Sequence, residues 1–128
     1  MSRTLRLSLL DGRFAVVRLD AAAPLPAAPP TATLWSATRT ADELSLVCDE
    51  AQIPAGARVE RGWRAFALEG PIPFEQTGVI AGLTAPLAAD GIPVFVLSTF
   101  DTDYLLVREA HVERTRDVLV RVAGCEIG

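Results

Sequence analysis

Two carboxylates stand in a polar turn between two apolar segments of the chain. The stretch "STFDTDYLLV" (residues 98–107) follows the apolar run "IPVFV" and ends in "YLLV", so Asp101 and Asp103 are expected between two buried strands. Carboxylates accept charge-assisted hydrogen bonds from an ammonium or guanidinium group. Hydroxyls and an aromatic ring stand beside them, on Ser98, Thr99, Phe100 and Thr102. The segment predicts either a turn that binds a cation or a plain solvated turn, since Asp is common in turns.

A helix expected over residues 77–91 supplies the opposite polarity. Apolar residues recur at helical spacing in "TGVIAGLTAPLAADG", with Thr77 as the predicted N-cap. The first amides of a helix lack intrahelical partners and carry the positive end of the dipole, so Gly78 and Val79 form an expected anion site. A zwitterion placed between this site and the acidic turn would be bound at both charged groups. Two or three hydrogen bonds at each group support an affinity on the order of micromolar to millimolar.

The composition excludes several other classes of function. The 128 residues suffice for one compact domain or two small units that share a core, and half of them are apolar, as in folded globular proteins. All twelve cations are arginines, dispersed along a chain of net charge −4, which argues against nucleic acid as a partner. The apolar runs are too short for a membrane span, and no secretion signal is recognisable, so a cytoplasmic location is expected by default.

Groups for catalysis or metal binding are scarce. Cys48 and Cys125 are too few and too far apart for a metal motif, and His111 is the one histidine of the sequence. Both thiols are expected to be small buried hydrophobes in strands, and His111 a surface residue at the start of a helix. Asp101 and Asp103 lack an accompanying nucleophile, phosphate loop or metal set. An enzyme is therefore a weaker hypothesis than a ligand-binding protein or a structural module. No catalytic residue, metal site or cofactor is predicted.

Strands, turns and one extended connector are expected in the first half of the chain. Alternating leucines followed by Asp11 and Gly12 predict a hairpin. Four prolines in "PLPAAPP" mark a connector, and "EAQIPAGARVERG" (residues 50–62) predicts a short helical turn followed by a linker. The expected strands are residues 4–10, which pair with 13–19, and residues 32–38, which pair with 43–49.

The second half carries the order β-α-β-β-α-β. Its elements are a strand at 63–70, a helix at 77–91, two apolar, central strands at 92–98 and 103–107, a helix at 109–124 and a short strand at 125–127. Pro86 predicts a kink or break in the first helix. Because the crossover is right-handed, this order gives an antiparallel sheet with both helices on one face, the ferredoxin-like arrangement. We therefore expect an α+β fold, with an intact unit over residues 63–128 and a degenerate, strand-rich copy over residues 1–62.

The segment "TGVIAGLTAPLAADGIPVFVLSTFDTDYLLVRE" resembles the ACT-domain family. In particular, it is similar to the ACT units of the CASTOR arginine sensors and to the regulatory ACT region of aspartate kinases. The resemblance follows helix, strand, turn and strand in order, and it is most specific at "TGV", "GIPVF" and "STFDTDYLLV". The first half resembles the same kind of unit loosely.

The resemblance implies a regulatory protein that binds a small molecule, typically an amino acid, and performs no chemistry on it. In that family the ligand commonly lies between the loop that starts the helix of one unit and the strand-turn loop of another. The corresponding residues here are Thr77, Gly78 and Val79, set against Thr99, Phe100, Asp101 and Asp103. The second side of the pocket is expected from another copy, in a homodimer. The alternative is a structural, homo-oligomeric interaction module without a ligand.

Overall fold

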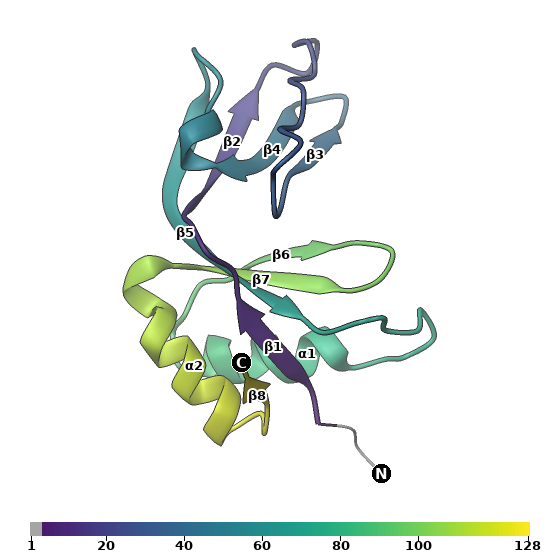
Figure 1. Ribbon diagram of the computed structural model, residues 1–128, viewed down its shortest axis with the longest axis vertical. Helices are drawn as coiled ribbons and strands as arrows, with labels where there is room; N and C mark the ends of the chain where they lie inside the picture. Colours follow the sequence, from purple (N-terminus) through teal and green to yellow (C-terminus); the bar gives the residue numbers. More distant parts are fainter. Residues whose placement is uncertain (1–3) are drawn as a thin grey trace. The chain divides into compact units, whose positions relative to one another are not determined.

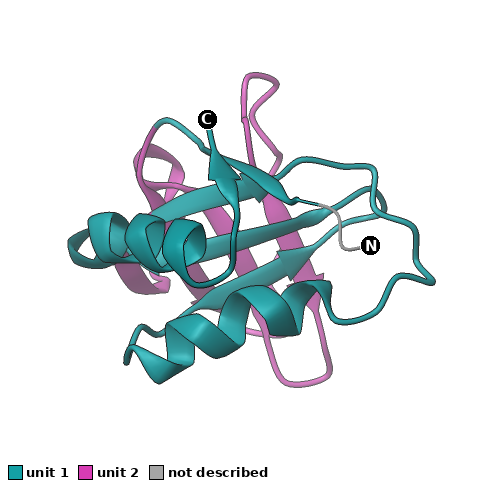
Figure 2. Ribbon diagram, turned by 90° about the horizontal axis from the view of Figure 1, so that it is seen from below, with its two compact units in different colours: residues 1–11, 64–128 teal, residues 12–63 magenta. Residues whose placement is uncertain are grey.

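The structure, a computed structural model, describes residues 4–128 and divides into two compact units (Figure 2). Unit 1 comprises the described residues up to Asp11 together with Arg64–Gly128, and unit 2 is Gly12–Trp63. Strand β5 (Arg58–Leu68) contributes its first residues to unit 2 and its last residues to unit 1. The start of the described chain thus groups with the second half of the sequence, because strand β1 (Arg6–Leu9) pairs with strands of unit 1.

Unit 1 contains the predicted order β-α-β-β-α-β. After β5 come α1 (Val79–Ala89), β6 (Phe95–Ser98), β7 (Asp103–Arg108), the short 3₁₀ helix η2 (Glu109–His111), α2 (Val112–Arg121) and β8 (Glu126–Ile127). The two helices lie side by side over one face of the strands of this unit (Figure 1). The expected α+β, ferredoxin-like architecture is therefore confirmed.

Strand β1 is an addition to that order, and it lies between the first and last strands. Leu7 is opposite Leu68 in the antiparallel pairing with β5, and opposite Ile127 in the parallel pairing with β8. The strands of unit 1 therefore run in the order β8-β1-β5-β7-β6. Arg6 adds exposed ion pairs of 3.4 Å with Glu69 and with Glu126, each worth at most about 1 kcal/mol. The strand ladders and the buried Leu7 contribute more to holding β1 than these charges do.

The predicted hairpin of residues 4–10 with residues 13–19 is wrong. Strand β2 (Phe14–Leu19) pairs with the first part of β5, where Phe14 is opposite Trp63, whereas β1 pairs with the last part of the same strand. Asp11 and Gly12 therefore connect β1 to β2, which both pair with β5, and the chain does not reverse its direction between them. Alternation of apolar residues specifies which face of a strand is buried, but it does not specify the partner strand.

Unit 2 is a sheet in the order β3-β4-β2-β5, with β3 (Ser36–Arg39) and β4 (Leu44–Asp49) paired as predicted. The expected short helical turn is the 3₁₀ helix η1 (Glu50–Gln52), but residues 58–62, predicted as a linker, belong to β5. The core contains Ala15, Val17, Leu44, Leu46 and Cys48, so this thiol is a buried hydrophobe as expected. Arg39 donates to the carbonyls of Ala21 and Ala23, which fastens the start of the proline-rich connector.

The core of unit 1 lies between the helices and the sheet. Its buried residues are Leu7, Phe66, Leu68, Leu83, Leu87, Ile92, Leu105, Val107, Val112, Val118, Leu119 and Cys125. Helix α1 continues through Pro86 to Ala89, so the break expected there does not occur. Both predicted central strands had apolar sequences, but only β7 is buried, through Leu105, Leu106 and Val107. Strand β6 is instead an edge strand that pairs with β7, and its Val96 is 37% exposed.

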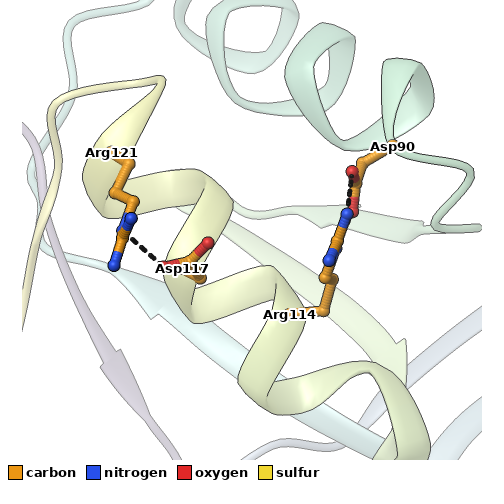
Figure 3. Close-up of polar contacts among 4 residues, drawn as sticks. All are labelled: Asp90, Arg114, Asp117 and Arg121. Atoms are coloured by element: carbon orange, nitrogen blue, oxygen red, sulfur yellow. Dashed lines mark hydrogen bonds and ion pairs between the residues drawn. The ribbon is translucent and has the colours of Figure 1, made fainter.

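An ion pair between the helices fastens the C-terminal end of α1. Arg114 of α2 donates through two nitrogens to both carboxylate oxygens of Asp90, at the C-cap of α1, with Nη2 2.7 Å from Oδ1 (Figure 3). This hydrogen bonding and the nearby positive charge hold the pKa of Asp90 below its ordinary value of 3.8. A lowered pKa in the folded state means that the ion pair stabilises the fold above 3.8, and that this contribution is lost as the pH falls below it.

We expect Asp90→Asn to lower the urea midpoint of unfolding at neutral pH, with a difference from wild type that shrinks in acid below pH 3.8. The matched control is Asp117→Asn, because Asp117 pairs with Arg121 within α2, at 2.7 Å, and links no second element. The control should change the midpoint less. Equal midpoints for wild type and Asp90→Asn at neutral pH would contradict this role.

Candidate functional site

A pocket of about 330 Å³ lies in unit 1, between the β5–α1 connection, the first turn of α1 and the β6–β7 turn. Its lining contains every predicted site residue except Thr77 and Asp101. The predicted residues that it brings together are Gly78, Val79, Ser98, Thr99, Phe100, Thr102 and Asp103. The helix start and the acidic turn, predicted as opposite sides of a site, therefore meet within one chain. A second copy is not required to bring them together.

The β6–β7 turn is closed by hydrogen bonds of its own residues. The amide of Thr99 donates to the carbonyl of Thr102 at 2.8 Å, which leaves Phe100 and Asp101 at the tip. Ser98 and Asp103 are opposite each other in the strand register, and the Ser98 hydroxyl donates to Oδ1 of Asp103 at 2.5 Å. A carboxylate has about four lone-pair sites, so Asp103 retains capacity to accept from a ligand.

The same turn is attached to the β5–α1 connection. The amide of Ile72 donates to the carbonyl of Asp101 at 2.8 Å, and the Thr102 hydroxyl donates to the carbonyl of Leu68 at 2.5 Å. Gly70 permits this approach, because a Cβ at that position would lie 2.7 Å from the carbonyl oxygen of Asp101. The connection and the turn are thereby held in backbone contact, and the pocket opens beside that contact.

Helix α1 starts without a side-chain cap. Gly78 is the N-cap residue, in the left-handed conformation with φ 78°, so the prediction of Thr77 as the cap is wrong. The first intrahelical bond runs from the Gly82 amide to the Gly78 carbonyl, at 2.9 Å, which leaves the preceding amides without helical partners. Those amides belong to Val79, Ile80 and Ala81, which all line the pocket. The positive end of the helix dipole therefore lies among residues that line the pocket.

Two exposed aromatic rings meet beside the pocket. Phe74 of the connection and Phe100 of the turn are in edge-to-face contact, with ring centroids 5.0 Å apart and planes at 89°. They are 71% and 80% exposed, and both line the pocket. An edge-to-face pair contributes about 0.5–1.5 kcal/mol beyond the area that it buries. The two rings thus add an apolar contact to the backbone contact between the same two segments.

Sequence reasoning did not identify the part of the lining that comes from the β5–α1 connection and from the second and third residues of α1. These residues are Ile72, Pro73, Phe74, Gln76, Ile80 and Ala81. The available signal was the apolar stretch "PIPF" in a segment too rich in proline for a helix. Thr77 and Asp101, in contrast, do not line the pocket.

Other chemical groups of the described chain lie away from this pocket. Cys125 is buried, as predicted, and burial raises the pKa of its thiol. The pKa of Cys48 is also raised, by burial and by the nearby charge of Asp49. Within residues 4–128 no group of three or more His, Cys, Asp or Glu side chains is placed to hold a metal ion. None of the helices described is long and apolar enough to cross a membrane.

Comparison with known families identifies the architecture. The model of the ACT domain matches residues 58–121, which is half of the chain, and a second family model, of an N-terminal domain, matches residues 12–56. The chain belongs to the ACT-domain family. The first match begins with β5 and ends with α2, so it contains the entire pocket.

Individual relatives agree with this assignment. A crystal structure of a protein from Agrobacterium tumefaciens superposes on this ACT protein with a TM-score of 0.89, at 40% identity, over 99% of this chain and 94% of that one. The cytosolic arginine sensor for mTORC1 subunit 1 of Rattus norvegicus is 35% identical over 60 residues, which are 46% of this chain and 18% of the sensor. This chain therefore spans under a fifth of the curated relatives that it matches.

Aspartate kinases share the fold. The Synechocystis enzyme has a TM-score of 0.64 at 14% identity, over 95% of this chain and 27% of the kinase. At that identity the likeness concerns the fold alone. The resemblance to the ACT units of arginine sensors and of aspartate kinases, first noted in the helix, strand and turn motifs, is thus confirmed.

We expect Gly70→Ala to destabilise the protein by about 1–3 kcal/mol, because the added methyl would press on the carbonyl of Asp101. The Ile72 to Asp101 hydrogen bond should weaken, which amide hydrogen exchange at Ile72 would register as lost protection. Gly82→Ala is the matched control, since a Cβ there meets nothing within 4 Å and the site is helical. The control should gain about 0.5–1 kcal/mol. Unchanged protection of Ile72 in Gly70→Ala would contradict the predicted contact.

Proposed function

We propose that this ACT protein is a regulatory, non-catalytic protein that binds an amino acid in the pocket between the start of α1 and the β6–β7 turn. The observation that carries the proposal is the composition of the lining: one cavity of a single chain is lined by the first residues of α1, whose amides lack helical partners, and by the acidic residue Asp103. The two groups are complementary to the carboxylate and the ammonium of an α-amino acid.

In this complex the ligand carboxylate accepts hydrogen bonds from the amides of Val79, Ile80 and Ala81, and the ammonium donates to Asp103. Each charge-assisted bond contributes about 1.5–3 kcal/mol, and association costs offset a large part of the sum. The hydroxyls of Ser98 and Thr99 extend the polar side of the pocket. Among the proposed site residues, Thr77 and Asp101 lie outside the lining, and Thr102 fastens the turn to Leu68.

Catalysis has no support in the same lining. The hydroxyl of Ser98 donates a hydrogen bond to Asp103. Among the described residues that line the pocket, no histidine or cysteine is present to support nucleophilic catalysis. The relatives named as arginine sensors are regulatory proteins by name, and we extend a sensing role from them to this chain as part of the proposal. The proposal includes a cytoplasmic location, supported by the word "cytosolic" in the name of those relatives.

We propose further that the protein is a homodimer, with a ligand-dependent interface as its regulatory output. Strand β6 is an edge strand with an exposed Val96, and the edge strand of a sheet can pair with a strand of a second copy. The same observation favours the second candidate function, a structural interaction module that assembles without a ligand. Light scattering coupled to size-exclusion chromatography, with and without amino acids, separates the two, because only the sensor changes its assembly or its stability on addition.

We expect a panel of amino acids in a thermal-unfolding assay to contain at least one that stabilises the protein. A ligand at 100 times its dissociation constant adds about 2.7 kcal/mol. Asp103→Asn should reduce that stabilisation by weakening affinity at least tenfold, because the ammonium loses its counter-charge.

The matched control for this variant is Asp101→Asn, which changes a carboxylate two residues away that does not line the pocket. It should leave the affinity within about twofold of wild type, since an exposed charge is screened by solvent. If no amino acid stabilises the protein at millimolar concentration, the structural module becomes the better description. Equal losses in both variants would place the cationic end of the ligand elsewhere.

A further inference from the structure

We infer that the pocket selects amino acids with an uncharged, apolar side chain; this inference rests on the proposed function and adds a ligand class to it. Of the described residues that line the pocket, Asp103 alone has a charged side chain. The other acid of the turn, Asp101, lies outside the lining, and its carbonyl is engaged by the amide of Ile72. The cavity thus supplies one negative charge, which matches the one ammonium of a zwitterion.

A bound zwitterion accounts for the one charged side chain of the described lining and for the amides at the start of α1. Its ammonium donates hydrogen bonds to Asp103. Its carboxylate accepts hydrogen bonds from the amides at the start of α1, where the helix dipole is positive. A cationic side chain, as in lysine or arginine, would need a second acid that the lining does not contain. An anionic side chain would need a second anion site, and the described lining contains neither Lys nor Arg. A third charge would therefore find no further counter-charge among the side chains of the described lining.

The rest of the lining favours an apolar side chain. Ile72, Phe74 and Phe100 stand on the connection and the turn, and Val79 and Ile80 stand on α1. The rings of Phe74 and Phe100 could offer a cation a π face, but each is largely exposed, and one presents its edge to the face of the other. Cation–π attraction is weakest at exposed rings. A hydrocarbon side chain, in contrast, gains by covering both rings from water.

The cavity is large enough for a single amino acid. Its volume of about 330 Å³ is at the lower end of the range of about 300–1,000 Å³ that small-molecule sites occupy. The similarity to arginine sensors extends over 60 residues at 35% identity and does not determine the side chain that is bound. Selection by charge is therefore inferred from the lining of this pocket itself.

Isothermal titration calorimetry of the full chain with matched ligand pairs tests the inference. Norleucine has the carbon skeleton of lysine without its second ammonium, and citrulline is an uncharged analogue of arginine. We expect norleucine to bind at least tenfold more tightly than lysine, and citrulline at least tenfold more tightly than arginine. Leucinamide and N-acetylleucine, which lack the carboxylate and the ammonium respectively, should each bind at least tenfold more weakly than leucine.

A variant that changes the number of charges provides the second test. Gln76 lines the pocket, and Gln76→Glu adds an acid of nearly the same shape. We expect this variant to reduce the norleucine preference over lysine at least fivefold, while Asp101→Glu, outside the lining, keeps the wild-type ratio. An unchanged ratio in Gln76→Glu would contradict selection by charge. Lysine or arginine binding wild type as tightly as its uncharged analogue would overturn this inference and leave the proposed function intact, whereas no heat with any amino acid would overturn both.

Discussion

The backbone contact between the β5–α1 connection and the β6–β7 turn is the constraint on which the rest of the site depends. Gly70 lets the two segments approach, the Ile72 amide donates to the carbonyl of Asp101, and Thr102 is bonded back to Leu68 at the end of β5. The contact thereby joins the segment that leads into α1 to the turn that leads into β7, where Asp103 is the first residue. In the proposed complex, this contact would hold the start of α1 and Asp103 close together before a ligand arrives, which would lower the ordering cost of binding.

The ferredoxin-like order explains why these two segments meet. A right-handed crossover through α1 makes β6 run in the same direction as β5, so the end of β5, the start of α1 and the turn after β6 all lie at one end of the sheet. Residues far apart in the sequence, such as Leu68 and Thr102, therefore become neighbours through topology alone. The Asp90 to Arg114 ion pair fastens α1 at its other end, where it cannot obstruct the pocket.

The sequence was informative where local physical chemistry decides the structure. The helix period, the turn acids and the strand order predicted the elements of unit 1 from β5 to β8, and with them seven of the thirteen residues that line the pocket. It failed where distant partners decide. Alternation around Asp11 and Gly12 predicted a hairpin because it cannot reveal that β5 is long enough to pair with both flanking strands. Phe74 and Ile72 were missed because a loop conformation, set by a backbone contact at Asp101, brings them to the site.

The inserted strand β1 has a consequence for how this protein reaches its native state. Leu7 is paired with Leu68, near the middle of the sequence, and with Ile127, which is far from Leu7 in the sequence. Closing such long loops costs conformational entropy before the hydrogen bonds between the strands can form. A high contact order of this kind slows folding. The last strand, β8, has only two residues and pairs with β1, so its docking must wait until β1 is in position. Completion of the sheet edge is therefore expected to be a late kinetic event, after the helices have packed.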